Sequence, residues 1–237
     1  MSLLTGKERA DYVQAMFGRI AHRYDLLNRL MTLGQDIRWR KEVIRHLEVK
    51  PGDIVLDLGS GTGDIAYDIA RRVPHSVVVA CDFTEEMLRV GKKRENGNSL
   101  NWVIADAQNL PFASECSQAI VSGFLLRNVP DVDRTLQEHR RVLVPGGRAA
   151  SLDTSPPRKN ILKPFLDFHF KVVIPILGKL VAGDGEAYTY LPDSTAKFLT
   201  AEVLAQRFIA AGFKQVGFVR RMLGTIGIHW GTKQDNA

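Results

Sequence analysis

The sequence predicts an α/β fold: a doubly wound, mostly parallel, seven-stranded Rossmann-like sheet with helices on both faces. Two observations support this. Short apolar runs of strand length alternate with amphipathic helical stretches between residues 53 and 153. A glycine-rich turn directly follows the first apolar run, at residues 59–63. With 45% hydrophobic and 24% charged residues, the 237-residue chain has the composition of a globular protein and is not expected to be disordered.

The elements follow from hydrophobic spacing and from glycine and proline positions. Residues 7–47 have helical spacing, and Gly34 divides them into two parts. After Pro51-Gly52 the pattern predicts strands over 53–59, 77–82, 102–105, 117–123 and 148–153, with helices over 65–73, 85–93 and 132–143 between them. Pro145-Gly146-Gly147 is expected to end the third of these helices. A helix over 200–211, capped by Thr200, and strands near 215–222 and 225–230 complete the sheet.

We expect one domain over residues 1–237. It comprises an N-terminal helical extension (1–50), a cofactor-binding core (51–157), a helical lid or insertion (158–197) and a segment that completes the sheet (198–237). The two cysteines, Cys81 and Cys116, predict neither a disulfide framework nor a metal site. The N-terminus lacks the apolar core of a signal peptide, and charges and prolines interrupt the most apolar stretch, 161–181. A soluble, cytoplasmic protein is therefore expected.

The net charge of +6 is unevenly distributed. Residues 1–50 carry +4, residues 51–157 carry −3 and residues 158–237 carry +5. Basic flanks of this kind suit nucleic acid, an anionic membrane surface or a charged cosubstrate. The alternative is that these side chains only keep the surface soluble.

The turn after the first predicted strand is the strongest functional signal. Gly59, Gly61 and Gly63 alternate with single residues, and Thr62 lies among them. Asp57 precedes the first glycine by two positions, where a carboxylate would repel a pyrophosphate but attract a cation. S-adenosyl-L-methionine carries an ammonium and a sulfonium and has no phosphate, so it fits this pattern. The alternative interpretation is a tight structural turn.

Three further strand ends supply candidate cofactor contacts. Asp82 ends the second strand, where a carboxylate can bind both ribose hydroxyls, and Phe83 follows it. Asp106 and the backbone of Ala107 follow the third strand and can contact the adenine edge. On its own Asp106 is more often typical of a helix cap, and its place at the third consecutive strand end favours the cofactor role. Gly123 ends the fourth strand over the same crevice.

At this point the sequence resembles the C-methyltransferases of menaquinone and ubiquinone biosynthesis, within the class I S-adenosylmethionine-dependent methyltransferases. The resemblance covers nearly the whole chain. The motifs that carry it are Tyr24–Asn28, Trp39-Arg40-Lys41, Asp57–Asp64, Leu126–Val129 with Asp131, Tyr188–Ser194, Ala211-Gly212-Phe213 and His229–Lys233. It implies methyl transfer from S-adenosylmethionine to a ring carbon of a polyprenylated quinol, with demethylmenaquinol the first candidate. It also implies cofactor contacts at Thr62, Asp82, Asp106, Ala107 and Gly123.

Two positions depart from the family pattern. Leu125 stands where the family has glycine, and Asp153-Thr154-Ser155 replaces Glu-Phe-Ser. Both departures concern the shape of the substrate pocket rather than the cofactor loop.

The implied reaction requires a phenolate, because a ring carbon is a weak nucleophile until the adjacent hydroxyl, with a pKa near ~10, loses its proton. Arg127 is the first candidate to stabilise that phenolate; the alternative is a salt bridge to Asp131 or Asp133. Asn128 can orient a quinol oxygen or cap a turn. Tyr24 and Asp25 can fold over the site from the extension, or serve as a buried tyrosine and a helix cap.

Histidines are further candidate bases, because their pKa lies near working pH. His22 and His229 are candidates, with structural roles as the alternative, and His139 is expected on the surface of its helix. The apolar side chains of 161–181 can line a channel for the prenyl tail while Lys163, Lys171 and Lys179 face lipid phosphates; the alternative is a lid that completes the core.

The expected partners are a polyprenyl quinol and, through the basic flanks, the inner face of a membrane; a homodimer stays open. Two other functions remain: methylation of another small molecule, and a non-catalytic cofactor-binding scaffold. Nucleic acid is not an expected partner, because the sequence lacks an Asn/Asp-Pro-Pro-aromatic tetrad. A dehydrogenase is disfavoured by the glycine spacing.

Overall fold

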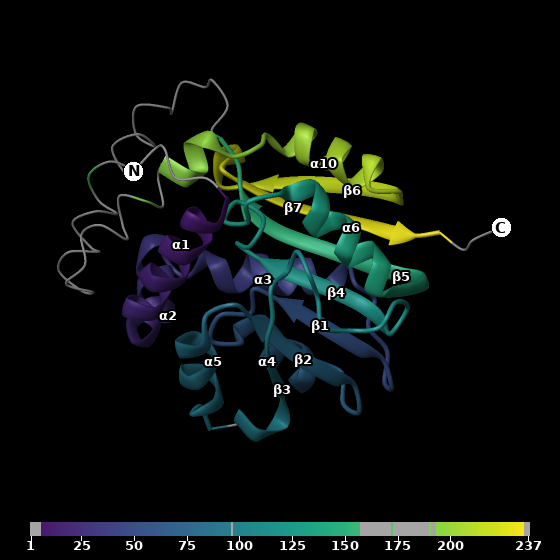
Figure 1. Ribbon diagram of the computed structural model, residues 1–237, viewed down its shortest axis with the longest axis horizontal. Coiled ribbons are helices and arrows are strands. Elements are labelled where there is room, and N and C mark those ends of the chain that lie inside the picture. The colour runs from purple at the N-terminus through teal and green to yellow at the C-terminus, as the bar shows by residue number, and fades with distance from the viewer. Residues whose placement is uncertain (1–5, 96, 157–171, 173–189, 191–192, 235–237) are drawn as a thin grey trace.

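A computed structural model describes residues 6–95, 97–156, 172, 190 and 193–234 of the chain. A seven-stranded sheet forms its centre, in the order β3-β2-β1-β4-β5-β7-β6 (Figure 1). The pairs β3-β2, β2-β1, β1-β4 and β4-β5 are parallel, and β7 runs antiparallel to both β5 and β6. The predicted doubly wound, mostly parallel sheet is confirmed.

The strands lie close to the predicted ranges. They are β1 (Ile54–Leu58), β2 (Val77–Asp82), β3 (Asn101–Ile104), β4 (Ser117–Gly123), β5 (Leu143–Thr154), β6 (Phe213–Arg221) and β7 (Ile226–Lys233). The helices between them are α4 (Asp64–Arg72), α5 (Glu85–Lys92), α6 (Val132–Val142) and α10 (Ala201–Ala210). The Thr200 hydroxyl accepts a hydrogen bond from the backbone N–H of Val203, so Thr200 caps α10 as predicted.

Three helices precede the sheet: α1 (Gly6–Ile20), α2 (Tyr24–Met31) and α3 (Gln35–Arg45). A short 3-10 turn at Ala21–Arg23 joins α1 to α2, and Gly34 with φ of 73° precedes α3. Helices α1 and α2 share a small core of their own that contains Met16, Ile20, Leu27 and Met31. The described part of the predicted extension is therefore helical between Gly6 and Arg45, apart from short turns.

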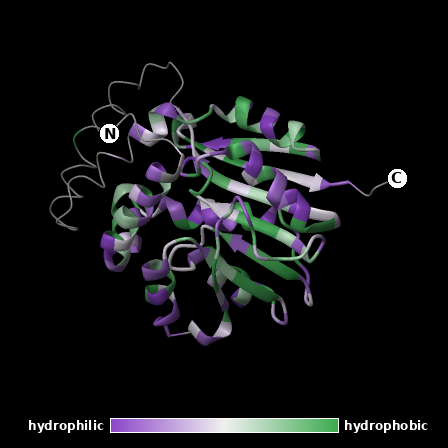
Figure 2. Ribbon diagram, in the orientation of Figure 1, coloured by the Kyte–Doolittle hydropathy of each residue, from purple (hydrophilic) through white to green (hydrophobic). Residues whose placement is uncertain are grey.

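Two hydrophobic cores cover the two faces of the sheet. On one face, Trp39 of α3 and Ile69 of α4 pack with Val55 of β1. On the other, Leu136 of α6 and Phe208 of α10 pack with Leu56 of β1. Neighbouring strand residues thus face opposite cores, as the pleat requires, and Figure 2 shows hydrophobic colour along the central strands and mixed colour along the helices.

Two local expectations were wrong. Strand β5 begins at Leu143 rather than Arg148, because the Pro145-Gly146-Gly147 segment is accommodated as an irregularity in the pairing with β4. His139 is buried rather than exposed, since it lies one turn from Leu136 on the face of α6 that packs on the sheet. Burial lowers the pKa of His139 to about 4.

Residues 161–181, expected to form a tail channel or a lid, lie outside the described part of the chain apart from Val172. Within the described part, no helix is both long enough and apolar enough to cross a bilayer.

Candidate functional site

The glycine-rich turn joins β1 to α4 at the carboxyl end of the sheet. Gly59, Gly61 and Gly63 have φ of 65°, 57° and 84°, values that L-residues with a Cβ rarely adopt. A Cβ on Gly59 would also lie 2.8 Å from Cδ1 of Leu125. All three glycines are therefore needed for the backbone conformation, and Gly59 is also needed for close packing.

Asp57 lies beneath this turn and is only 1% exposed. Its Oδ2 accepts a hydrogen bond of 3.0 Å from the backbone N–H of Ala66, whereas Oδ1 has no hydrogen-bond partner among the described residues. Burial raises the pKa of Asp57 to about 7, and the nearby Arg40 opposes that shift. A buried carboxylate oxygen without a donor is suited to receive a cationic ligand.

Asp82 ends β2 beside the same turn. Its Oδ2 accepts from the backbone N–H of Gly61 at 2.8 Å, and its Oδ1 accepts from that of Thr84 at 2.7 Å. Burial raises the pKa of Asp82, and the two hydrogen bonds offset only part of that rise. The carboxylate is thus fixed at the mouth of the crevice.

A crevice brings most of the predicted cofactor residues together. It is lined by Gly59, Gly61, Asp82, Phe83, Asp106, Ala107, Gly123 and Asn128, together with apolar side chains of α1 and of the segment after β4. The Oδ1 of Asp106 accepts from the backbone N–H of Gln108 at 2.9 Å, so this residue also stabilises its own turn.

A smaller hollow continues from the crevice beneath the glycine turn. Asp57, Tyr24, Asp25, Arg40 and Thr62 are among its lining residues, and Gly123 borders both spaces. The hydroxyl of Thr62 donates to the carboxylate of Asp25 at 2.8 Å. Helix α2 therefore covers the turn directly, which places Tyr24 and Asp25 where the sequence analysis expected them.

Charged groups around this hollow compensate one another. Asp64, at the start of α4, is paired with Arg29, Arg40 and Arg94. Asp36 is fully buried and is paired with Arg29 and Arg40. Burial lowers the pKa of Arg40. These ion pairs join α2 and α3 to the glycine turn.

Arg127 does not form the salt bridge that was considered for it. Its guanidinium pairs with Asp153 of β5 at 3.1 Å, and both side chains are buried. Asp131 instead caps α6 through the backbone N–H of Arg134, and Asp133 pairs with Arg207. Pairing of Arg127 with Asp131 or Asp133 was therefore wrong.

Arg127 is separated from the crevice by one aromatic ring. Its guanidinium carbon lies 4.9 Å from the ring centre of Phe124, which lines both the crevice and the hollow. Phe124 has φ of 60°, unusual for a bulky residue and typical of strain at functional sites. Asn128 lines the crevice, and its Oδ1 accepts a 3.1 Å hydrogen bond from the hydroxyl of Tyr190.

The candidate histidine bases lie elsewhere. His229 is buried in β7 beside the rings of Phe208 and Phe218, and its Nε2 lies 2.9 Å from the carbonyl oxygen of Ala201. Burial lowers the pKa of His229 to about 4. His22 is exposed on the turn between α1 and α2. Neither histidine lines the crevice or the hollow.

Several lining residues were not among the predicted site residues. Ala10, Val13 and Phe17 of α1 line the crevice, although their helical spacing alone indicates an ordinary packed face. Leu125 was noted only as a departure from the family pattern, yet it packs on Gly59. Arg40 belongs to a quoted motif but was given no role.

The residues present fit S-adenosylmethionine. Asp57 offers an ammonium a buried carboxylate oxygen that has no hydrogen-bond partner among the described residues. Asp82 offers ribose hydroxyls a carboxylate that is held in place by backbone hydrogen bonds. The glycine turn between them lets a ligand approach the backbone closely.

A model of the ubiE/COQ5 methyltransferase family matches residues 5–233. The chain belongs to this family. A family relative from Desulfotalea psychrophila, named ubiquinone/menaquinone biosynthesis C-methyltransferase UbiE, is 50% identical over 221 residues, covering 93% of this chain and 90% of the relative. A demethylmenaquinone methyltransferase from Lactobacillus johnsonii is 38% identical over 236 residues, 98% of this chain and 96% of that protein. The chain is therefore an S-adenosyl-L-methionine-dependent C-methyltransferase.

Solved structures of lower sequence identity share the fold. A phosphoethanolamine N-methyltransferase from Haemonchus contortus, in complex with S-adenosylhomocysteine, gives a TM-score of 0.68 at 13% identity, covering 99% of this chain and 61% of that one. A SAM-dependent methyltransferase from Aquifex aeolicus gives 0.59 at 18% identity, covering 82% and 89%. At these identities the likeness shows the class I methyltransferase fold alone.

Proposed function

We propose that this chain methylates a ring carbon of a polyprenylated quinol, with demethylmenaquinol to menaquinol as the first candidate reaction. The observation that carries the proposal is the 50% identity, over 93% of the chain, to a relative named ubiquinone/menaquinone biosynthesis C-methyltransferase UbiE, together with 38% identity to a demethylmenaquinone methyltransferase. The crevice supports it, because apolar side chains of α1 face the predicted cofactor residues across it. An aromatic ring would be held between these two walls.

We assign the cofactor to the residues around the glycine turn. S-adenosylmethionine supplies an electrophilic methyl group on its sulfonium. Asp57 would bind the ammonium, Asp82 the ribose hydroxyls, and Asp106 with the backbone of Ala107 the adenine edge. Thr62 and Gly123 complete the assignment, with Gly59, Gly61 and Phe83 shaping the cavity and Gly63 forming part of the turn.

For the acceptor we assign a phenolate-stabilising role to Arg127. Arg127 does not line the crevice, so this role requires the quinol oxygen to reach past the Phe124 ring. A guanidinium there lowers the pKa of that hydroxyl and makes the adjacent ring carbon more nucleophilic. Asp153 keeps the Arg127 side chain in place through their buried ion pair. Asn128, held by Tyr190, would orient the quinol oxygen, while Tyr24 and Asp25 would close the site from α2 and exclude water.

We also propose that residues 1–50, 51–157, 158–197 and 198–237 form one domain around this site. The described contacts between α2 and the glycine turn support the first part of that proposal. The part played by residues 161–181 in accommodating the prenyl tail lies outside the described residues.

The test is a methyl-transfer assay with labelled S-adenosylmethionine, the purified chain, and demethylmenaquinol or a benzoquinol precursor in lipid vesicles. Arg127→Lys serves as the matched variant because it keeps the charge opposite Asp153. We expect labelled menaquinol from the wild type and much less from the variant. If neither quinol is methylated although the cofactor binds, a scaffold is favoured; if a soluble, non-prenylated acceptor is methylated far better, another small-molecule substrate is favoured.

A further inference from the structure

An apolar stripe runs along the outer side of the N-terminal helices. It consists of Leu26, Leu30, Leu33 and Ile37, which are 54%, 39%, 84% and 40% exposed. Leu26 and Leu30 are four residues apart on one side of α2, Leu33 lies in the turn that follows, and Ile37 lies in the first turn of α3. These four of the eleven large hydrophobic residues exposed in the described part of the chain fall between residues 26 and 37, so exposed apolar side chains are concentrated in this segment.

Leu33 is unfavourable for folding in two ways. It is the most exposed of the eleven at 84%, and its φ of 51° lies in the left-handed region that favours glycine or asparagine. Stability of the isolated protein gives no reason for a leucine at this tip. A contact with an apolar environment outside the chain does give one.

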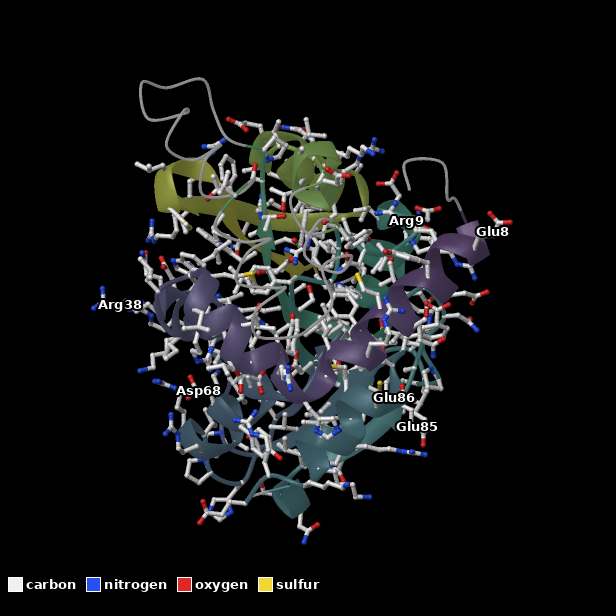
Figure 3. The ribbon with its side chains drawn as sticks, turned by 90° about the vertical axis from the view of Figure 1, so that its left-hand side faces the viewer. Glu8, Arg9, Arg38, Asp68, Glu85 and Glu86 are labelled. Atoms are coloured by element: carbon white, nitrogen blue, oxygen red, sulfur yellow. The ribbon has the colours of Figure 1, made fainter. Side chains whose placement is uncertain are left out.

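The charges around the stripe are mainly basic: beside Ile37 lie Asp68 and Glu95, but also Lys41, Arg71 and Arg94. Between residues 22 and 41 the exposed charged side chains are Arg23, Arg38 and Lys41, all basic. The two acidic residues of this segment are used internally: Asp36 is buried in ion pairs, and Asp25 accepts a hydrogen bond from Thr62. Figure 3 shows Arg38 projecting outward at the edge of the molecule. An apolar stripe bordered by basic residues is typical of helices that lie on an anionic bilayer.

We propose that this stripe docks the protein on the surface of an anionic membrane, an inference that rests on the proposed function because a polyprenyl quinol resides in the bilayer. Helix α2 presents Leu26 and Leu30 to the outside and Tyr24 and Asp25 to the glycine turn. Docking would therefore bring the cofactor site next to the lipid phase that holds the substrate. A second copy of the chain fits less well, because a two-fold contact through this stripe would place basic groups against basic groups.

The experiment is flotation of the full chain with vesicles of phosphatidylcholine alone or mixed with phosphatidylglycerol. We expect binding to the anionic vesicles that weakens with salt. Leu30→Ser with Leu33→Ser should weaken it about tenfold or more, since the removed apolar surface no longer enters the bilayer. Arg38→Glu with Lys41→Glu should weaken it at least about fivefold per position on anionic vesicles only. The matched control is Val203→Ser with Ile209→Ser, two positions 41% and 49% exposed on α10, which should bind like the wild type.

Two measurements on the same variants keep the inference separate from the proposed function. Cofactor affinity and methylation of a short-tailed, water-soluble quinol should match the wild type, because the substituted side chains do not line the crevice. Two outcomes overturn the docking inference even if the quinol is methylated. Either the wild type does not bind vesicles, or the leucine variant binds them as well as the wild type does. A dimer in sedimentation that the leucine variant loses, without vesicle binding, would assign the stripe to a second copy and overturn it as well. Stripe-dependent vesicle binding supports the inference even if no quinol is methylated, which would count against the proposed function alone.

Discussion

Replacing Asp57 by Asn should weaken cofactor binding while stabilising the protein without cofactor. The amide oxygen can still accept from the backbone N–H of Ala66, so the local fold is retained. The variant lacks the negative charge that would receive the ammonium. Charge-assisted hydrogen bonds contribute about 1.5–3 kcal/mol, which predicts a cofactor Kd about 10- to 200-fold higher.

The stability change follows from the raised pKa. Asp57 titrates at about 7 in the folded protein and at 3.8 ordinarily, so the folded state binds the proton more tightly. Stability therefore falls as pH rises from 3.8 towards 7, by on the order of 4 kcal/mol, and stays low above that. The Asp57→Asn variant would avoid this loss but would bury an unpaired N–H₂ at a cost of about 1–3 kcal/mol. The net expectation above neutral pH is a gain of about 1–3 kcal/mol.

Two assays check this pair of effects. Calorimetric titration with S-adenosylmethionine across pH should show wild-type affinity that falls below about pH 7, with a weaker dependence in Asp57→Asn. Protonation of the ligand itself affects both proteins equally. The difference between their pH dependences of affinity therefore reports the titration of residue 57. Urea unfolding without ligand measures stability. Unchanged cofactor affinity, or lost affinity together with lost stability, would refute the assignment of Asp57 as an ammonium partner held at a cost to the fold.

Three further expectations concern other parts of the site and core. Arg127→Lys should lower kcat about 100-fold and leave cofactor Kd unchanged, because the charge opposite Asp153 remains but the planar guanidinium is lost; a raised Kd in titration would contradict a role confined to the acceptor. Gly59→Ala should weaken cofactor binding at least about tenfold, since the new Cβ would lie 2.8 Å from Leu125. Leu125→Ala in the same chain should restore part of that affinity, and no recovery would rule out the packing reason. His139→Leu should flatten acid destabilisation in urea unfolding: with a pKa of about 4 against 6.5 ordinarily, His139 removes up to about 3 kcal/mol as pH falls through that interval. Equal losses in both proteins would count against it.

The sheet could be predicted from sequence because its signals are local. Buried parallel strands are short apolar runs, and the glycine turn is required by backbone conformation at Gly59, Gly61 and Gly63. The start of β5 could not be predicted, because Pro145-Gly146-Gly147 ends a helix and also enters a strand, and only the neighbouring strand decides the latter. The burial of His139 likewise could not be predicted, because it depends on which face of α6 packs on the sheet.

The cofactor residues were predictable as a group because carboxyl ends of parallel strands meet at one edge of the sheet, which brings Asp82, Asp106 and Gly123 to one crevice. The partner of Arg127 was not. Asp131 and Asp133 are close to Arg127 in sequence, but Asp131 caps α6 and Asp133 pairs with Arg207 of α10. Asp153 is 26 residues away from Arg127 in sequence and lies on β5. Partner choice among several carboxylates depends on tertiary packing, which sequence spacing does not specify.

The N-terminal helices belong to the site rather than to its periphery. Helices α1 and α2 have their own small core, so they could be regarded as a separate appendage. Yet α1 lines the crevice, Asp25 binds Thr62, and Asp64 at the start of α4 is paired with Arg29 of α2 and Arg40 of α3. Buried ion pairs become costly when one partner is removed, so displacing these helices would leave Asp64 with Arg94 as its remaining partner next to the glycine turn. The same helices carry the apolar stripe on their outer side. Because α2 contacts the glycine turn through Asp25 and exposes Leu26 and Leu30 on its other side, a bilayer bound at the stripe would lie next to the cofactor site. This proximity is the reason we expect lipid contact to aid delivery of the quinol and not to change cofactor binding.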